Sequence, residues 1–271
     1  MPAFSLAALT VLELAPPAQI DVAASCGYDA VGIRLLPAMP SGIAYPLDDK
    51  ASLKETLARL DATGIKVADL EVVAIRPETD IAAFTVFFET GARLGAKHIL
   101  VAGYDPDLGR FSDSLAKFCE AAAPYGLTAD LEFMPWTCVP DLATANRVVA
   151  PMGQANAGIL VDALHFDRSR SSTAELARVP VQRLHYWQLC DGPAERPATN
   201  EELIHAARHE RMFPGEGGID LVSLARAMPA DITISLEVPT AELAKTVGAK
   251  DRAQRALDTA KRLIAKACDG V

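Results

Sequence analysis

Four oxygen-bearing side chains lie at or near the ends of short apolar segments in the second half of the chain. Glu132, Asp162 and Glu237 each close such a segment, and Gln188 lies within another. If these segments are parallel strands of a barrel, their carboxyl ends meet at one mouth, where such folds place their chemistry. Carboxylates that share a cleft raise one another's pKa values unless a cation neutralises them. The pattern therefore predicts a single metal-binding site.

The donor types indicate which metal ions this site would bind. Three carboxylates and one amide, with no thiolate, favour hard divalent cations. We expect one Mg²⁺ or Mn²⁺ ion, with Co²⁺ or Zn²⁺ as alternatives. Any one of these carboxylates could instead pair with an arginine or a helix N-terminus, but the repetition at four strand ends favours a functional site.

Segments that resemble strands alternate with segments of helical periodicity along the whole chain. Leu53, Leu57 and Leu60 have helical spacing, whereas residues 65–74 are rich in β-branched side chains. Regular alternation predicts parallel strands with right-handed crossovers. We therefore expect the α/β class and a single (β/α)8 TIM barrel over residues 1–271. The expected strands lie near residues 4–9, 28–35, 65–74, 98–102, 128–132, 158–162, 184–191 and 231–237.

An open doubly wound sheet is the alternative architecture. It would normally carry a Gly-rich phosphate-binding turn after its first strand, and residues 9–12, Leu-Thr-Val-Leu, are not such a turn. Three irregular segments, 37–46, 103–111 and 192–218, are long enough to line the mouth of a barrel. Segment 192–218 is the longest, and we expect its middle, residues 200–210, to form a helical lid because loops of this length are usually functional.

Composition argues against several classes of function. Half of the 271 residues are hydrophobic, and the formal net charge is -9, which disfavours nucleic acid as a partner. No apolar run reaches the ~18 residues of a membrane span, and residues 1–4 show no signal-peptide pattern. The five cysteines are scattered, with no Cys-x-x-Cys pair, which favours reduced thiols and a cytoplasmic location.

The order of the polar motifs carries a family resemblance. The motifs are Glu132, Asp-x-x-His at Asp162 and His165, Gln-Leu-Cys-Asp at 188–191, Arg-x-x-Pro-Gly-Glu-Gly at 211–217, and Glu237. Together they resemble the xylose isomerase-like superfamily of TIM-barrel sugar and sugar phosphate isomerases and epimerases. The resemblance implies that the divalent ion is held by Glu132, Asp162, Gln188 and Glu237. It also implies that His165 and Arg211 contact the substrate, and that a homo-oligomer is a reasonable assembly.

The resemblance implies an enzyme that acts on a small carbohydrate or cyclic polyol or ketone. The substrate would bind the metal through a carbonyl and an adjacent hydroxyl, so that the metal stabilises the enediolate. Glu132 and Glu237 would be the base and the acid of an isomerase or epimerase. Trp136, just after Glu132, is expected to form an apolar wall of the substrate pocket.

Gln188 favours a second reaction class. Many epimerases of this superfamily have histidine at that position, and the amide resembles metal-dependent 3-dehydroshikimate dehydratases. In such a lyase His165 would be the base, and Arg211 would hold a substrate carboxylate. His185 lies three residues before Gln188, so we expect it to face the outer helices rather than replace a ligand. A barrel that only binds a ligand is the third, non-catalytic hypothesis.

Overall fold

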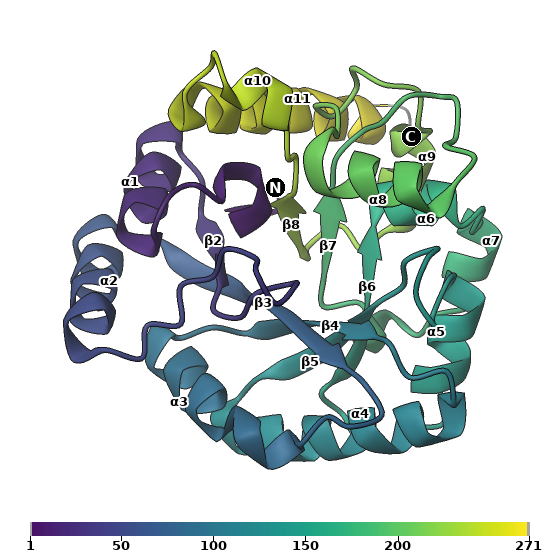
Figure 1. Ribbon diagram of the computed structural model, residues 1–271. Coiled ribbons are helices and arrows are strands. Elements are labelled where there is room, and N and C mark those ends of the chain that lie inside the picture. Colours follow the sequence, from purple (N-terminus) through teal and green to yellow (C-terminus); the bar gives the residue numbers. More distant parts are fainter. Residues whose placement is uncertain (1, 270–271) are drawn as a thin grey trace.

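The computed structural model describes residues 2–269, and within this range eight parallel strands close into a barrel surrounded by helices (Figure 1). Each strand pairs with its neighbours in sequence, and the last strand pairs with the first. The predicted (β/α)8 barrel is therefore confirmed, and the open doubly wound sheet is excluded. No helix within this range has the length and hydropathy that crossing a membrane requires.

The elements follow the order that the sequence predicts. The strands are β1 (Phe4–Leu6), β2 (Ala30–Arg34), β3 (Lys66–Ile75), β4 (His98–Gly103), β5 (Thr128–Glu132), β6 (Ala157–Asp162), β7 (Tyr186–Leu189) and β8 (Thr233–Leu236). The α-helices are α1 (Pro16–Cys26), α2 (Lys50–Thr63), α3 (Thr85–Leu94), α4 (Leu108–Ala122), α5 (Leu142–Val149), α6 (Ala163–Arg168), α7 (Thr173–Leu176), α8 (Asn200–His209), α9 (Leu221–Ala227), α10 (Ala241–Ala244) and α11 (Ala249–Cys268). Short 3₁₀ helices are η1 (Ala8–Val11), η2 (Ile81–Phe84), η3 (Ala123–Tyr125) and η4 (Val181–Arg183).

Local sequence explains where the helices begin and end. Pro16 opens α1, because proline lacks the N–H that has no partner in the first turn. Gly27 ends this helix in the left-handed region, with φ 84, and its N–H donates to the carbonyls of the last turn. Asp107 caps α4 by accepting hydrogen bonds from the N–H groups of Gly109 and Arg110, both at 3.0 Å.

The barrel interior contains an apolar layer directly below the strand ends. Leu100, Leu160 and Tyr186 form a buried cluster, and Val72 packs against it. Because side chains alternate along a strand, Leu160 and Tyr186 lie one inward position below Asp162 and Gln188. A larger apolar core lies between the strands and the outer helices. This packing holds the strand ends that carry the polar residues.

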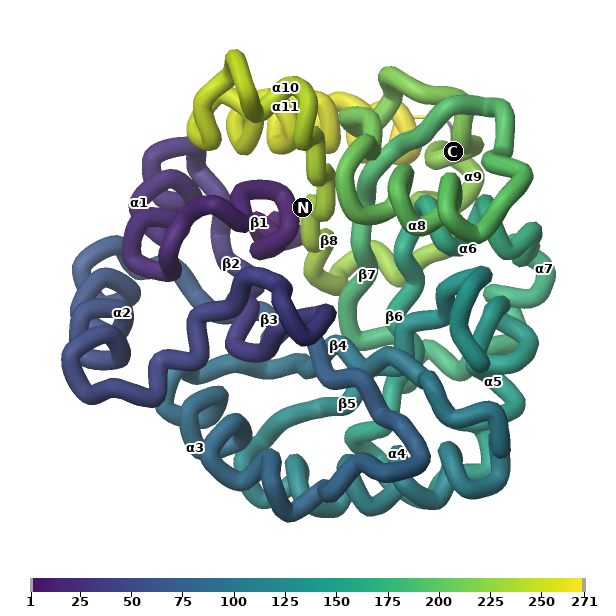
Figure 2. Tube along the Cα trace, in the orientation of Figure 1, coloured from purple at the N-terminus to yellow at the C-terminus, as the bar shows by residue number. Residues whose placement is uncertain are grey.

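Two segments over the mouth differ in how well the sequence predicted them. The helix expected near residues 200–210 is α8, and in the view of Figure 2 its trace overlaps the region of β6 and β7. Its role as a lid stays a prediction. The first strand was expected to reach residue 9, but it ends at Leu6, and η1 follows. The prediction that Leu9 belongs to a strand was therefore wrong, and Leu9 lines a cavity at the mouth instead.

Candidate functional site

Three of the four predicted ligands meet at the carboxyl end of the barrel. Glu132 and Asp162 are the last residues of β5 and β6, and Glu237 directly follows β8. One oxygen from each of the three carboxylates lies within 4.8 Å of the others. Gln188 on β7 is in register with Asp162 on β6, so the two residues lie at the same level of neighbouring strands. The structure thus places the predicted donors together from four consecutive strands.

The Gln188 side chain has no hydrogen-bond partner in the part of the chain that the structure describes. The residue is fully buried, and neither its amide oxygen nor its amide nitrogen is bonded. Buried polar atoms almost always have a partner, so each exception needs an explanation such as an ion or a water. An amide oxygen beside three carboxylates completes an oxygen donor set of the kind that hard divalent ions prefer. The residues present therefore fit a bound divalent metal.

Arg211 supplies one positive charge to this cluster. Its Nη1 lies 2.6 Å from Asp162 Oδ2, and its Nη2 lies 2.8 Å from Glu237 Oε2. Its Nε donates to the carbonyl of Ala207 in α8, which orients the guanidinium. A single guanidinium balances one of three carboxylate charges. A divalent cation would balance the other two.

The electrostatics of the carboxylates agree with a missing positive charge. Burial raises the pKa of Glu132 well above its usual value, and the neighbouring charges of Glu237 and Asp162 raise it further. Burial also raises the pKa of Glu237 to about 7, although Arg211 opposes this shift. For Asp162 burial alone would raise the pKa, but Arg211 and His165 outweigh it and lower the value. Without a cation, these carboxylates resist being ionised together.

His165 and Trp136 lie beside the carboxylates. His165 Nε2 is 3.7 Å from Glu132 Oε1, and its backbone N–H donates to Asp162 Oδ1 at 3.0 Å. The Trp136 ring meets the imidazole edge-on, with centroids 5.1 Å apart. Burial lowers the pKa of His165 to about 4, so the imidazole is neutral and its nitrogens can accept or donate one proton. Trp136 Nε1 and His165 Nδ1 are buried without a partner among the described residues.

A hydrogen-bonded loop positions Arg211. The carboxylate of Asp191 accepts hydrogen bonds from the N–H groups of Gly215 and Gly217, both at 2.9 Å. A Cβ on Gly217 would overlap the Asp191 carboxylate, so this close approach requires glycine. Asp191 of the Gln-Leu-Cys-Asp motif therefore anchors the loop that the Arg-x-x-Pro-Gly-Glu-Gly motif forms.

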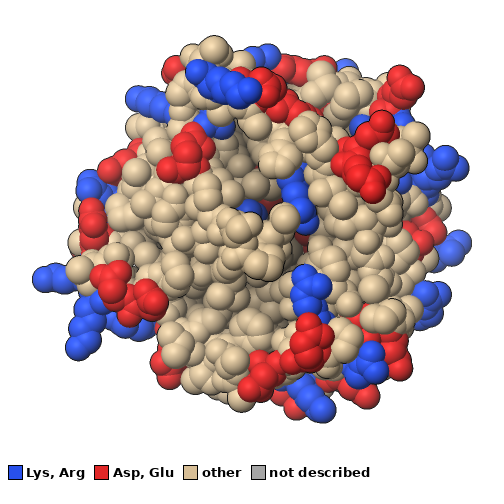
Figure 3. All heavy atoms as spheres, in the orientation of Figure 1, with Lys and Arg blue, Asp and Glu red and all other residues tan. Residues whose placement is uncertain are grey.

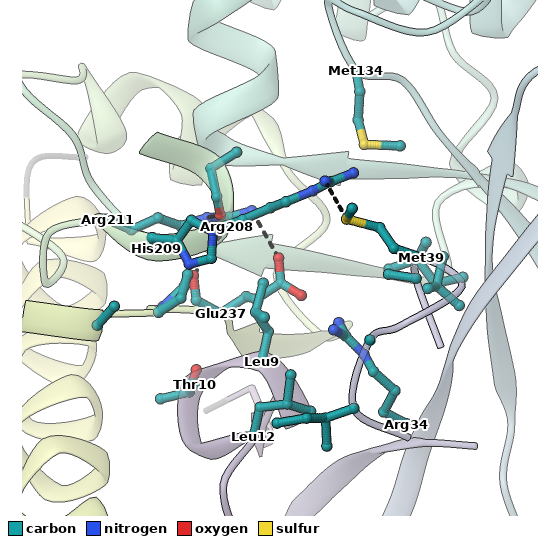
Figure 4. A pocket seen from close by; sticks show the side chains of 18 of the residues that line it. Leu9, Thr10, Leu12, Arg34, Met39, Met134, Arg208, His209, Arg211 and Glu237 are labelled. Carbon is teal, nitrogen blue, oxygen red and sulfur yellow. Dashed lines mark hydrogen bonds and ion pairs between the residues drawn. The ribbon is translucent and has the colours of Figure 1, made fainter. Parts of the chain in front are cut away.

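A cavity of about 390 Å³ opens above the carboxylates. Figure 4 shows Glu237 and Arg211 side by side in the cavity. Of the predicted site residues, Glu132, Trp136, His165, Arg211 and Glu237 line the cavity, whereas Asp162 and Gln188 are fully buried and do not. At one edge, Arg34 and Glu71 form a buried ion pair of 2.5 Å.

Several lining residues were missed by reasoning from sequence. The apolar walls include Leu9, Leu12 and Met134, and Arg208 from α8 lies at the mouth. The proline-rich segment 37–46 was predicted to line the mouth and does so through Met39 and Ile43. No periodic signal marks Leu9 or Leu12, because both follow a strand that ends early.

The expectation for His185 was wrong. Its Nδ1 lies 2.6 Å from Asp130 Oδ1 at the amino-terminal end of the barrel, where His98 lies close by. His185 precedes β7, so the alternation of a regular strand does not govern its side chain. Gly158 makes this contact possible, because a Cβ there would lie 2.5 Å from His185 Nδ1. His185 contributes nothing to the cluster at the other end of the barrel.

A closed parallel barrel with polar residues at the carboxyl ends of its strands is the architecture of TIM-barrel enzymes. The family model described as "Xylose isomerase-like TIM barrel" matches residues 20–265. The chain belongs to this family, and the resemblance noted from its motifs is confirmed.

Relatives with known activities include isomerases and a dehydratase. The chain is 25% identical over 192 residues to an inosose isomerase from Bacillus subtilis, which covers 67% of this chain and 66% of the relative. It is 30% identical over 111 residues to a 3-dehydroshikimate dehydratase from Pseudomonas aeruginosa, which covers 41% of this chain but only 17% of the relative. The chain thus spans less than two thirds of the length of either relative.

Among solved structures, the crystal structure of an IolI protein with a bound zinc atom superposes with a TM-score of 0.81. The identity is 22%, and the match covers 97% of this chain and 98% of that chain. At this identity the likeness concerns the fold.

Proposed function

We propose that this protein is a divalent-metal-dependent isomerase or epimerase of a small hydroxy-carbonyl compound. One observation carries the proposal: three carboxylates and an unpartnered amide surround a point where one guanidinium leaves two negative charges unbalanced. The names of the isomerase relatives support the reaction class, and the bound zinc atom in the IolI structure supports a metal. Mg²⁺ or Mn²⁺ is our first choice because the donors are all oxygen atoms.

The residues of this chain divide the work of proton transfer. A bound divalent ion would act as a Lewis acid that stabilises negative charge on the substrate oxygens. Glu132 and Glu237 belong to strands on different sides of the mouth, and both line the cavity. One glutamate would remove the proton next to the carbonyl, and the other would return a proton to carbon. Arg211, held by Ala207 and Asp162, would keep Glu237 in place during this exchange.

β-Elimination from a cyclic hydroxyketone is the second candidate, and two observations favour it. Gln188 provides an amide where many relatives are expected to have histidine, and one relative is a dehydratase. His165 is neutral and reaches into the cavity, so it could act as a base. His165 would take the proton from carbon, the adjacent hydroxyl would leave, and that proton would complete the water molecule released.

The remaining proposals concern the type of substrate, the location and the assembly of the protein. We keep a small-molecule substrate, a cytoplasmic location and a homo-oligomer as parts of the proposed function. All five cysteines are free thiols in the structure, which suits a reducing compartment.

The first experiment is metal analysis of wild type, Glu132→Gln and Glu237→Gln after loading with Mn²⁺, followed by solvent-deuterium exchange on ketoses and cyclic hydroxyketones. We expect one ion per chain in wild type, weaker retention in both variants, and deuterium next to the substrate carbonyl. Glu55→Gln, an exposed change on α2, is the control and should behave as wild type. The composition of the product distinguishes the two reactions, because an isomer keeps every oxygen atom of the substrate, whereas dehydration removes one as water. No metal uptake and no exchange would refute the proposal.

A further inference from the structure

The cavity above the carboxylates has two chemically different parts. Its floor carries Glu132, Glu237 and His165. Its walls are largely apolar, and they come from η1, the loop after β2, strands β3 and β4, and the loop after β5. The larger apolar residues that line the cavity are Leu9, Leu12, Met39, Ile43, Val72, Leu100, Met134 and Trp136. Figure 4 shows Leu9, Leu12, Met39 and Met134 around the opening, and in Figure 3 the hollow on this face is bordered mainly by uncharged side chains.

Two wall residues are unusually exposed for their type. Met39 is 48% exposed and Ile43 is 50% exposed, and only two other large hydrophobic residues among the described ones are as open to solvent. Both lie on the loop that borders the cavity. Clustered exposed apolar side chains mark binding surfaces more often than isolated ones do. These two side chains are therefore placed to contact a ligand.

The charged residues of the walls are mostly neutralised within the protein. Arg34 is paired with Glu71, and Arg252 is paired with Glu13. Arg208 crosses the mouth from α8, and its Nη1 lies 2.8 Å from the sulfur of Met39 (Figure 4). Three lining residues have a buried polar atom without a partner among the described residues: Trp136 (Nε1) and His165 (Nδ1) beside the carboxylates, and Thr240 (Oγ1) after β8. The wall formed by Leu9, Leu12, Ile43 and Val72 thus offers few polar groups to a ligand, and the carboxylates and His165 lie at the floor.

This distribution limits the substrate. A sugar with a hydroxyl on every carbon would place hydroxyl groups against Leu9, Leu12, Ile43 and Val72, which offer no hydrogen bond. Burying a hydroxyl without a partner is costly, whereas burying a methylene group is favourable. Pockets of this kind select ligands by a few polar contacts and a fitted apolar surface.

We propose that the cavity binds a hydroxy-carbonyl compound whose remaining part is apolar, rather than a polyhydroxylated sugar. The polar end lies at the carboxylate floor, and the apolar body lies between η1, the loop after β2 and Met134. The part of this inference that concerns the polar end rests on the proposed function, whereas the part that concerns the apolar body rests on the cavity walls.

Binding of hydroxamates to Mn²⁺-loaded protein tests the proposal without turnover. All hydroxamates present the same chelating group, so the acyl chain alone differs. Hexanohydroxamate and gluconohydroxamate have equal carbon numbers, but the second carries hydroxyl groups along its chain. By titration calorimetry we expect hexanohydroxamate to bind about fourfold tighter than acetohydroxamate for each added methylene group that is buried. We expect gluconohydroxamate to bind more weakly than hexanohydroxamate by at least about tenfold.

A double variant locates the apolar contact. Met39→Ser with Ile43→Ser changes two half-exposed side chains, so the fold should tolerate it. The variant should lose several-fold affinity for hexanohydroxamate and keep wild-type affinity for acetohydroxamate. Val181→Ser, at another exposed hydrophobic residue that is 56% exposed and lies outside the cavity, is the control and should change neither affinity.

The outcomes separate the two proposals. If no hydroxamate binds to protein exposed to Mn²⁺, the metal-dependent function is refuted. If acetohydroxamate binds but gluconohydroxamate binds as tightly as hexanohydroxamate, the apolar substrate class is wrong while the metal site stands. Equal affinity of wild type and the double variant for hexanohydroxamate would also overturn the inference.

Discussion

Gln188 shows how one buried side chain can indicate a site. A fully buried amide with no partner costs free energy of folding, because both its oxygen and its nitrogen lose their hydrogen bonds to water. A protein keeps such an unfavourable residue where the residue serves another purpose, such as binding a ligand. Arg211 shows the complementary case, because its buried charge is matched by Asp162 and Glu237. At the scale of residues, these charges and dipoles are the basis of our proposal that the site binds a cation.

Gln188→Leu should separate metal binding from folding. Without metal, the free energy of unfolding should stay the same or rise by about 1–2 kcal/mol, because the variant buries no unpartnered amide. Metal affinity should fall about tenfold or more. Thermal unfolding at increasing Mn²⁺ concentration measures both effects. Gln182→Leu, an exposed change, is the control, and an equal metal-dependent rise in Tm for Gln188→Leu and wild type would contradict the assignment.

At the scale of elements, α8 is tied to the site through Arg211. It is held at its start by a capping box, in which Thr199 Oγ1 accepts from the N–H of Glu202 at 3.2 Å and the Glu202 carboxylate accepts from the N–H of Thr199 at 3.1 Å. At its other end, the carbonyl of Ala207 accepts the hydrogen bond from Arg211. A short helix with few buried residues depends on such caps, since only Ala207 is buried within it.

Thr199→Ala should therefore loosen α8. Loss of an N-cap costs about 1 kcal/mol, which corresponds to roughly fivefold faster hydrogen exchange of the α8 amides by local opening. Exchange followed by mass spectrometry on peptides from residues 199–211 measures this change. Ser172→Ala removes the equivalent capping box of α7 and should accelerate exchange there without affecting α8. Unchanged α8 exchange in Thr199→Ala would show that the cap does not control the opening of α8.

At the scale of the whole molecule, the barrel carries polar clusters at both ends. The amino-terminal end holds Asp130 between His98 and His185, and the two imidazoles are stacked with centroids 5.7 Å apart. Burial alone would lower the pKa of His185, but the hydrogen bond and charge of Asp130 outweigh it and raise the value. This contact joins the start of β7 to β5 across Gly158 on β6. It lies at the opposite end of the barrel from the proposed chemistry, and we expect it to contribute to stability.

The contribution of His185 to stability should depend on pH. A raised folded-state pKa means that the contribution is complete below the unfolded value of about 6.5 and is lost as pH rises through the folded value. The free energy of unfolding of wild type should exceed that of His185→Gln by about 1–3 kcal/mol at pH 6, and the difference should shrink toward pH 8. Urea unfolding at each pH measures it. His205→Gln replaces an exposed histidine on α8 as a control, and a difference that grows with pH would contradict the argument.

The sequence alone determined the barrel, the family and the positions of the polar residues. Strand and helix signals are local, and in a closed parallel barrel every strand end reaches the same mouth, so Glu132, Asp162 and Glu237 could be placed together before any coordinates. The prediction of α8 succeeded for the same reason, because its capping box lies within a few residues.

Only the tertiary structure decided what surrounds these residues. The ion pairs of Arg211 join residues 49 and 26 positions apart in the chain, and no local pattern encodes them. The apolar walls combine η1, the loop after β2 and the loop after β5, so their shared surface exists only once the barrel closes. His185 was misplaced because its contact depends on the space that Gly158 leaves on another strand. Contacts between distant segments depend on packing, and they define the substrate class that we propose.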